Sequence, residues 1–230
     1  MKFKIRIFDA DETLLDYRKS ENYALEQMLQ VVGCNIAFDE AKRVYHSIND
    51  NLWIDYEKGL TTVKNLRIQR FADLMSYLGI VYNAEDVSKI YLSNFAQAGF
   101  LMAGADDFLE KLREIDGVNL IISNGSKVTQ YGRFFRAGFD DIFDKYIISE
   151  ELQMKKPDYQ IFEYALAPYP EYTKDEIIMI GDSLVSDISG GKNYGIKTCW
   201  FNLKKTENTT DIIPDFTVTN YNDLFELLTS

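Results

Sequence analysis

Two carboxylates, Asp9 and Asp11, stand one residue apart directly after a short apolar run, and the hydroxyl of Thr13 follows two residues later. The run is rich in Ile and Phe, which is typical of a buried strand. In open parallel α/β sheets, ligands bind at the carboxyl ends of the strands, where these groups would lie. An Asp pair after a strand is also a common turn former, so the rest of the chain must decide between a turn and a site.

Polar residues also follow three later apolar runs, each of which we expect to be a strand of the same sheet. They are Ser123-Asn124-Gly125, Lys155-Lys156-Pro157 and Gly181-Asp182-Ser183, with Asp187 beyond. Because parallel strands open on the same edge, these groups would converge with Asp9 and Asp11. Together they offer an oxyanionic nucleophile, hard oxygen ligands for Mg²⁺ and donors for phosphate oxygens. Phosphoryl transfer through an aspartyl-phosphate needs this set.

Taken singly, each later segment has a simpler explanation. Ser-Asn-Gly is a common turn, and a lone lysine such as Lys156 is usually a solvated surface charge. Asp182 and Asp187 would favour the first turn of the following helix. The order and spacing of all four segments together are specific, and they favour a phosphoryl-transfer site.

The chain that carries these segments divides into two kinds of sequence. Helical patterns cover about 21–32, 39–58, 61–78 and 84–97, with no convincing strand among them. Ser20 is the expected N-cap of the first helix, and Gly33 is its expected stop. Residues 16–98 are therefore predicted to form an all-α cap domain, inserted just after the first strand.

From Gly104 onwards, predicted helices and strands alternate, which is typical of a parallel sheet with helices on both faces. We expect strands near 118–125, 145–149, 176–183, 197–201 and 216–219, with helices near 105–114, 126–137, 158–167, 184–194 and 221–228. The predicted fold class is α/β, with a doubly wound, Rossmann-like core formed by residues 1–15 and 99–230.

Composition narrows the possible partners. The 25 Lys and Arg against 36 Asp and Glu give 25 − 36 = −11, without a basic block. This balance argues against a nucleic-acid polymer or an anionic membrane as partner, and local cations would have to attract a phosphate.

Cys34 and Cys199 form no disulfide framework, and Cys199 is expected to be a buried thiol. His46 is the single histidine, so it is assigned to surface or cap packing rather than to a metal site. Without an apolar run of about 20 residues or a signal segment, we expect a soluble, cytoplasmic protein.

The four polar segments resemble the four motifs of the haloacid dehalogenase-like (HAD) hydrolase superfamily. The matching stretches are Asp9-Ala10-Asp11-Glu12-Thr13, Ser123-Asn124-Gly125, Lys156-Pro157 and Gly181-Asp182-Ser183-Leu184-Val185-Ser186-Asp187. The helical insertion resembles the small α-helical cap of that family, so the resemblance covers nearly the whole chain. It implies a hydrolase of phosphoric monoesters with a small-molecule substrate.

The resemblance also implies catalytic roles. Asp9 would be the nucleophile that forms an aspartyl-phosphate. Asp11 would protonate the leaving oxygen and then activate the hydrolytic water, a second carboxylate that the dehalogenases of the superfamily lack. Asp11 would then be protonated when substrate binds, while Asp9 stays ionised by facing the metal.

The remaining motif residues would bind metal and phosphate. The Asp9 carboxylate, the Asp11 backbone carbonyl and Asp182 would hold Mg²⁺, with Asp187 as a further ligand or as support for the others. Ser123, the backbone amide of Asn124 and Lys156 would bind the phosphate. Pro157 directly after Lys156 fits the motif better than an assignment to Lys155, and Thr13 would support the loop.

A further resemblance concerns the substrate. The segment 52–59, with stretches near 148–151, 156–158 and 198–202, is similar to the bacterial pyrimidine 5′-nucleotidases of the superfamily. The simplest role for Trp53 and Tyr56 is packing within the cap. The resemblance makes these two aromatic residues candidates to stack on a nucleobase.

Several alternatives stay open at this stage. A phosphoglycolate or sugar-phosphate phosphatase would use the same core, and so would a β-phosphoglucomutase-like isomerase. A phosphonate hydrolase would need an activated cap lysine, and neither Lys58 nor Lys64 is marked as one. A receiver-type signalling module shares the Asp, Ser/Thr and Lys constellation. It would be about half this length, without a helical cap or an acid equivalent to Asp11.

Overall fold

The computed structural model describes residues 2–58 and 60–230, without the side chains of Trp53, Tyr56, Glu57 and Val63. The chain divides into two compact units. We call residues 1–17 with 99–230 the α/β unit, and residues 18–98 the helical unit. Among the described residues, no helix combines the length and apolarity needed to cross a membrane.

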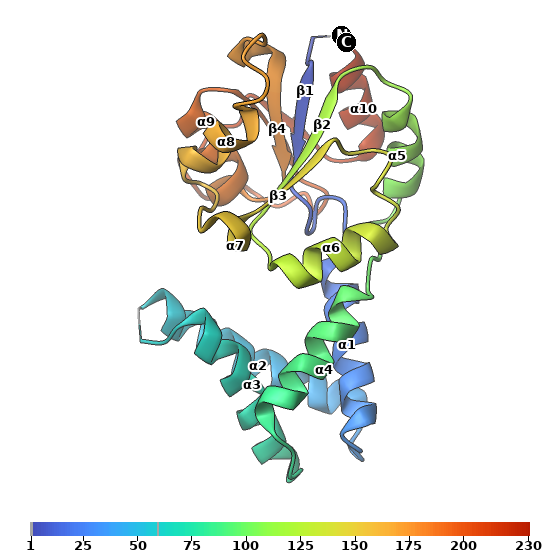
Figure 1. Ribbon diagram of the computed structural model, residues 1–230, viewed down its shortest axis with the longest axis vertical. Coiled ribbons are helices and arrows are strands. Elements are labelled where there is room, and N and C mark those ends of the chain that lie inside the picture. Colours follow the sequence, from blue (N-terminus) through green and yellow to red (C-terminus); the bar gives the residue numbers. More distant parts are fainter. Residues whose placement is uncertain (1, 59) are drawn as a thin grey trace. The chain divides into compact units, whose positions relative to one another are not determined.

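The described part of the α/β unit is built on a six-stranded sheet in which every neighbouring pair is parallel. The strands are β1 (Ile5–Phe8), β2 (Val118–Ser123), β3 (Lys145–Ile148), β4 (Ile177–Gly181), β5 (Lys197–Phe201) and β6 (Phe216–Val218). Their order is β3-β2-β1-β4-β5-β6, and Figure 1 shows β1 (blue) between β2 and β4. The strand order reverses at β1, which is where open α/β sheets bind ligands.

Helices cover both faces of this sheet (Figure 1). One face packs against α5 (Ala105–Arg113), α6 (Lys127–Arg136) and α10 (Tyr221–Thr229), and the other against α8 (Tyr159–Leu166) and α9 (Ser189–Tyr194). Near-continuous Ile and Phe runs form strands here because both faces are buried. The architecture confirms the predicted α/β class with a doubly wound parallel sheet. Cys199 of β5 is buried, as predicted, and burial raises the pKa of its thiol to about 12.

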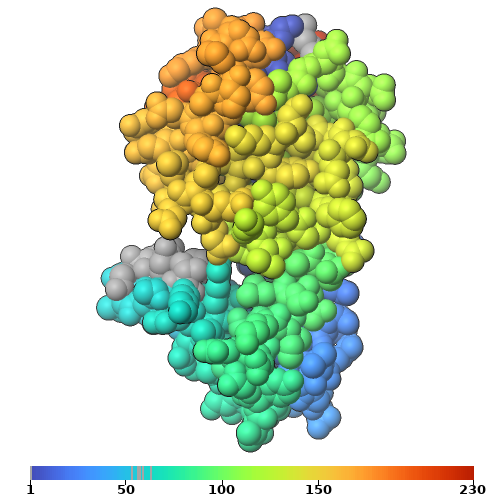
Figure 2. Space-filling model, in the orientation of Figure 1, coloured from blue at the N-terminus to red at the C-terminus, as the bar shows by residue number. Residues whose placement is uncertain are grey.

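Three short elements were not predicted as separate from their neighbours. They are α7 (Ser149–Leu152), a 3₁₀ turn at Lys174–Glu176 and a π-helical turn at Leu184–Ile188 before α9. In Figure 2 the atoms of β3, α7 and α8 (yellow to orange) lie on the visible face of the α/β unit, beside green to yellow-green atoms of α5 and α6. Segments this short carry too few residues for a periodic apolar pattern to identify them.

The helical unit contains α1 (Tyr17–Val31), α2 (Phe38–Glu57), α3 (Val63–Leu78) and α4 (Ala84–Ala96). Ring contacts at its centre join Tyr45, Phe71 and Tyr91, one from each of the last three helices. Local signals mark the end of α3 and the start of α4. Asn83 caps α4 by accepting from two backbone amides, and Gly79 ends α3 in a left-handed conformation.

The predicted cap of the first helix was wrong. Ser20 lies inside α1, whose first residue is Tyr17, and its hydroxyl donates to the carbonyl of Ala98 at 2.7 Å. The serine therefore ties the first helix of the unit to its last residue. Contact with a distant residue decides this role, which a local capping pattern does not reveal.

Candidate active site

The loop after β1 places Asp9 at the carboxyl edge of the sheet. The Asp9 amide donates to the carbonyl of Ile180 at 2.8 Å, so the residue is fixed beside β4 although β1 ends at Phe8. The loop then closes on itself, with the amides of Leu14 and Leu15 donating to the carbonyl of Ala10. Asp9 is only 8% exposed, so it is a buried residue rather than part of an exposed surface turn.

Thr13 connects this loop to the loop after β4. Its side chain is fully buried, and its hydroxyl oxygen accepts from the amide of Asp182 at 3.1 Å. Two polar loops that are 169 residues apart in sequence are thereby held against each other. This hydrogen bond is how Thr13 would support the loop.

Lys156 is buried between two carboxylates. Its Nζ lies 2.5 Å from Oδ1 of Asp9 and 2.8 Å from Oδ1 of Asp187. Burial alone would lower the pKa of Lys156, but Asp187 and Asp9 raise it overall, so the amine stays charged. The neighbouring Lys155 is exposed, which agrees with the preference for Lys156.

Asn124 fixes the loop that carries Lys156. The Asn124 side chain accepts from the amide of Lys156 at 2.9 Å and donates to its carbonyl at 3.0 Å. This reciprocal pair uses both ends of the carboxamide, so a serine or an aspartate could not replace it. The loop after β2, which carries Asn124, thus sets the position of the buried Lys156.

The carboxylates of Asp9, Asp182 and Asp187 form a buried to half-buried triad, in which one oxygen of each residue lies within 4.8 Å of one oxygen of each of the other two. Burial raises the pKa of Asp9 well above its ordinary value, Lys156 opposes this rise, and Asp187 and Asp182 add to it. Burial, Asp187 and Glu12 likewise raise the pKa of Asp182 to about 7. Such crowding of like charges is stable when a cation is held among them.

The charges of this cluster suit a divalent cation. Three carboxylates and one ammonium leave −3 + 1 = −2. Carboxylate oxygens are the hard ligands that Mg²⁺ takes in proteins, usually with substrate oxygens and water completing the shell. The residues present therefore fit such an ion.

Hydrogen bonds to the rest of the protein hold Asp187 in place within the triad. Its Oδ2 accepts from the amide of Ser183 at 3.0 Å, and its Oδ1 accepts from Lys156. The carboxylate lies directly over Gly181, where a Cβ would overlap its Oδ2 and Cγ. A residue with a side chain at position 181 would displace Asp187, so this glycine is needed for space.

Asp11 faces away from the acidic triad, towards α6. Its two oxygens accept from Arg133 Nη1 at 2.5 Å and from Gln130 Nε2 at 3.0 Å. Gln130 also donates to the hydroxyl of Ser123 at 2.6 Å. The sequence reasoning missed both α6 residues. Their only local signal is that two large polar side chains, three positions apart, share the face of α6 that carries the buried Phe134.

All the predicted core residues thus meet at one edge of the α/β unit. The two aromatic candidates belong to the helical unit. Trp53 and Tyr56 belong to α2, and their side chains lie outside the described residues.

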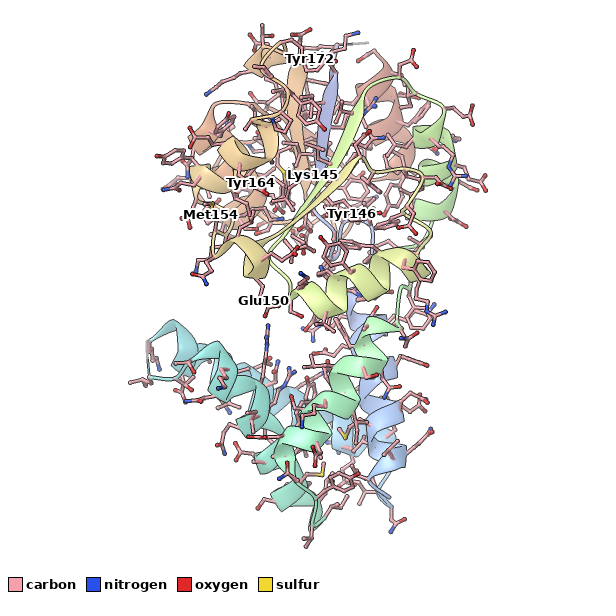
Figure 3. All side chains as sticks on the ribbon, viewed as in Figure 1. Lys145, Tyr146, Glu150, Met154, Tyr164 and Tyr172 are labelled. Atoms are coloured by element: carbon pink, nitrogen blue, oxygen red, sulfur yellow. The ribbon has the colours of Figure 1, made fainter. Side chains whose placement is uncertain are left out.

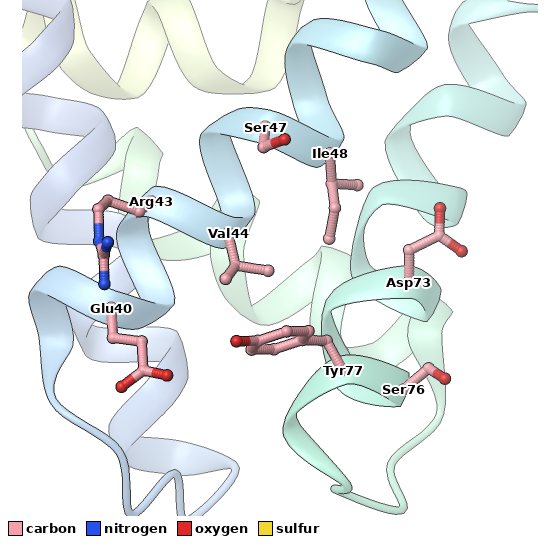
Figure 4. Close-up of a pocket in the computed structure, with 8 residues that line it drawn as sticks. All are labelled: Glu40, Arg43, Val44, Ser47, Ile48, Asp73, Ser76 and Tyr77. Atoms are coloured by element: carbon pink, nitrogen blue, oxygen red, sulfur yellow. The ribbon is translucent and has the colours of Figure 1, made fainter.

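Two other hollows offer no comparable chemistry among the described residues. A groove of about 670 Å³ in the helical unit lies between α2 and α3, with Arg43, Asp73 and Tyr77 on its walls (Figure 4). A smaller one of about 380 Å³ follows the edge strand β3, where Lys145, Tyr146 and Tyr164 are labelled in Figure 3. Neither groove is lined by a residue of the acidic triad.

Gly181→Ala is expected to displace the Asp187 carboxylate and to lower the free energy of unfolding by about 1–3 kcal/mol, as overpacking usually does. Urea unfolding measures this cost. A double-mutant cycle supplies the control, because Asp187→Gly removes the whole side chain that the new methyl meets. The alanine should cost markedly less in that background. An equal cost in both backgrounds would contradict the steric explanation.

Comparisons with known proteins identify the family of this chain. A family model described as haloacid dehalogenase-like hydrolase matches residues 6–201. The pyrimidine 5′-nucleotidase PynA of Streptococcus pneumoniae is 36% identical over 229 residues, covering 99% of this chain and 96% of that protein. The pyrimidine 5′-nucleotidase YjjG of Escherichia coli is 32% identical over 228 residues, covering 99% of each chain.

A solved structure shows the same architecture. The HAD-hydrolase YfnB of Bacillus subtilis, in a crystal form bound to magnesium, superposes with a TM-score of 0.88 at 28% identity, covering 100% of both chains. These findings confirm the sequence-based predictions of the family and of a phosphoric monoester hydrolase. The chain belongs to the haloacid dehalogenase-like hydrolases.

Proposed function

We propose that this protein is a Mg²⁺-dependent phosphomonoester hydrolase that acts through an aspartyl-phosphate, with pyrimidine nucleoside monophosphates as substrates. The observation that carries the chemistry is the buried Asp9, paired with Lys156 beside two further carboxylates at the switch point of the sheet. The observation that carries the substrate class is the similarity to two relatives named pyrimidine 5′-nucleotidases.

In the first step, a carboxylate oxygen of Asp9 bonds to phosphorus and the ester P–O bond breaks. Asp11 gives its proton to the leaving oxygen, which departs as an alcohol. In the second step, water attacks the phosphorus of the aspartyl-phosphate and passes a proton to Asp11. The bond between phosphorus and Asp9 breaks, so inorganic phosphate leaves and both carboxyl groups return to their initial states.

In this proposal one set of groups binds the phosphoryl oxygens and a second set holds the ion. Lys156, the Ser123 hydroxyl and the Asn124 amide donate to the phosphate. Asp9, Asp182 and the Asp11 carbonyl, with Asp187 as ligand or support, would hold Mg²⁺, which when bound supplies positive charge against the carboxylates and the phosphate oxygens. Burial raises the pKa of Asp9 in the protein alone. A nearby positive charge would favour the ionised carboxylate, which is the form that attacks phosphorus.

The helical unit is the proposed cap, with Trp53 or Tyr56 stacking on the base. Because stacking accepts any base face, the discrimination of pyrimidine from purine would come from the size of the site. Sugar phosphates, phosphoglycolate and a mutase reaction remain competing uses of the same core. The match to a hydrolase family over residues 6–201 favours hydrolysis over a receiver-type module. A cytoplasmic location stays a prediction.

Asp9→Asn should lower phosphate release by about 10³-fold or more, because the amide is a far weaker nucleophile. The fold should persist, since Lys156 keeps its contact with Asp187. Steady-state kinetics with p-nitrophenyl phosphate measures the loss, and circular dichroism checks the fold. Asp107→Asn, on an exposed position of α5, is the matched control and should retain full activity. Near-normal turnover by Asp9→Asn would refute the mechanism.

Mg²⁺ should raise the melting temperature of the wild-type protein, since an ion that binds only the folded state stabilises it by about 2.7 kcal/mol at 100 times its Kd. Asp182→Asn should lose at least half of this shift, because the triad loses one of its charges. Differential scanning fluorimetry with and without Mg²⁺ reads this out without any substrate, and EDTA should abolish turnover of the wild type. An unchanged shift in Asp182→Asn would place the ion elsewhere.

A matched set of substrates tests the proposed base recognition. UMP should exceed ribose 5-phosphate in kcat/KM by about 10-fold or more, because these molecules differ only in the base and stacking is worth about 1–3 kcal/mol. AMP and phosphoglycolate extend the set, with phosphate release as the readout. Equal rates for UMP and ribose 5-phosphate would indicate a sugar-phosphate phosphatase. No release from any ester would refute the hydrolase proposal.

A further inference from the structure

Two buried polar residues of α6 contact the proposed acid–base group. Gln130 is 1% exposed and Arg133 is not exposed at all, and they lie three positions apart on the same helix. Arg133 Nη1 donates to Asp11 at 2.5 Å and to Oε1 of Gln130 at 3.0 Å. Buried polar side chains are costly unless they are hydrogen-bonded, so their placement against Asp11 needs an explanation.

The protons of the Gln130 carboxamide are fully committed. Its Nε2 carries two protons, of which one reaches Asp11 Oδ2 at 3.0 Å and the other reaches Ser123 Oγ at 2.6 Å. Its oxygen accepts from Arg133, so the amide cannot flip without losing three hydrogen bonds. Gln130 thus links the acid–base candidate to the phosphate-binding candidate.

This link decides which way the Ser123 hydroxyl points. Ser123 Oγ accepts from Gln130 and also from the amide of Gly125 at 3.1 Å. A hydroxyl has two acceptor positions and one proton. With both acceptor positions occupied by N–H donors, Ser123 can contribute only its proton to a further partner. A donor is what a phosphoryl oxygen requires.

The glycine of the same segment is a second, independent sign of this arrangement. A Cβ built on Gly125 would lie 2.7 Å from Cγ and Cδ of Gln130 and 2.8 Å from its Nε2. The φ angle of Gly125 is not among the positive values of the chain, so backbone freedom does not explain the glycine. It leaves room for the Gln130 side chain.

We infer that Gln130 is a positioning residue of this enzyme. Through its two N–H groups, and with Arg133 behind it, Gln130 keeps the Ser123 hydroxyl as a donor to the phosphoryl group. It also holds the Asp11 carboxyl in a fixed orientation relative to the leaving oxygen. The inference rests on the proposed phosphomonoester hydrolysis and adds a residue outside the four motif segments.

The required chemistry explains why the residue is a glutamine. A glutamate at this position would offer only acceptors, would repel Asp11, and would draw the Ser123 proton towards itself. A methionine has a similar length and shape, but it would leave both partners without their donor. The two substitutions therefore remove the same hydrogen bonds with and without added charge.

The test compares wild type, Gln130→Met and Gln130→Glu, with Tyr131→Phe as the matched control on α6. The Tyr131 hydroxyl donates a hydrogen bond to Glu151, which is not a residue of the proposed site, so the Tyr131→Phe variant should behave as wild type. Two esters separate the roles, because p-nitrophenolate leaves without a proton, whereas the alkoxide of UMP needs one. Kinetics with Mg²⁺ gives kcat and KM for both, and calorimetry gives the affinity for inorganic phosphate.

For Gln130→Met we expect kcat on UMP to fall by about 100-fold and kcat on p-nitrophenyl phosphate by about 10-fold or less, since misplacing an acid mainly affects the poor leaving group. Phosphate affinity should fall by about 5- to 10-fold, the loss of one hydrogen bond of about 1 kcal/mol. Gln130→Glu should lose more in both measurements because of the added charge.

Equal losses on the two esters, with unchanged phosphate affinity, would overturn the inference and leave Gln130 with a structural role. Unchanged kinetics in Gln130→Met would overturn it as well. If the wild type hydrolysed neither ester, the proposed function would fail, and phosphate affinity would still decide the Ser123 part. Weaker binding by Gln130→Met would then support that part, and equal binding would refute it.

Discussion

The ammonium of Lys156, buried between Asp9 and Asp187, is the interaction on which the rest of the site depends. Removing a charge from water is expensive, and here the opposite charges compensate for it only because they lie within hydrogen-bond distance. The positive charge of Lys156 also reduces the repulsion among the three carboxylates that share this edge of the sheet. Since one positive charge faces three negative ones, the cluster retains the excess negative charge that suits a divalent ion.

Contacts between loops keep this cluster in place. The Asn124 carboxamide fixes the backbone of Lys156, and the Thr13 hydroxyl fixes the amide of Asp182. Each contact joins loops from different strands, so the parallel sheet sets the distance between the loops and the side chains set their registration. Catalytic groups supported in this way need little reorganisation when a substrate binds.

The two oxygens of Asp11 are also held by side chains from another part of the fold. They contact α6, which packs on the sheet face opposite α8 and α9, while Asp9 belongs to the acidic triad. Two carboxyl groups one residue apart therefore meet different surroundings. Asp9 is buried among carboxylates and a lysine, and Asp11 is held by an amide and a guanidinium. Different surroundings are what allow two carboxyl groups of one loop to take different chemical roles.

The sequence by itself determined the fold class, the four helices of the helical unit and the residues at the strand ends, because apolar periodicity and the order of polar segments are local properties of the chain. Tertiary structure decided the role of Ser20, the pairing of Lys156 with two carboxylates, and the contacts of Gln130 and Arg133 with Asp11. These contacts join residues far apart in the sequence, from 31 positions for Lys156 with Asp187 (187 − 156 = 31) to 147 positions for Lys156 with Asp9. No local pattern encodes such contacts, because they arise only when the sheet brings separate loops and α6 together.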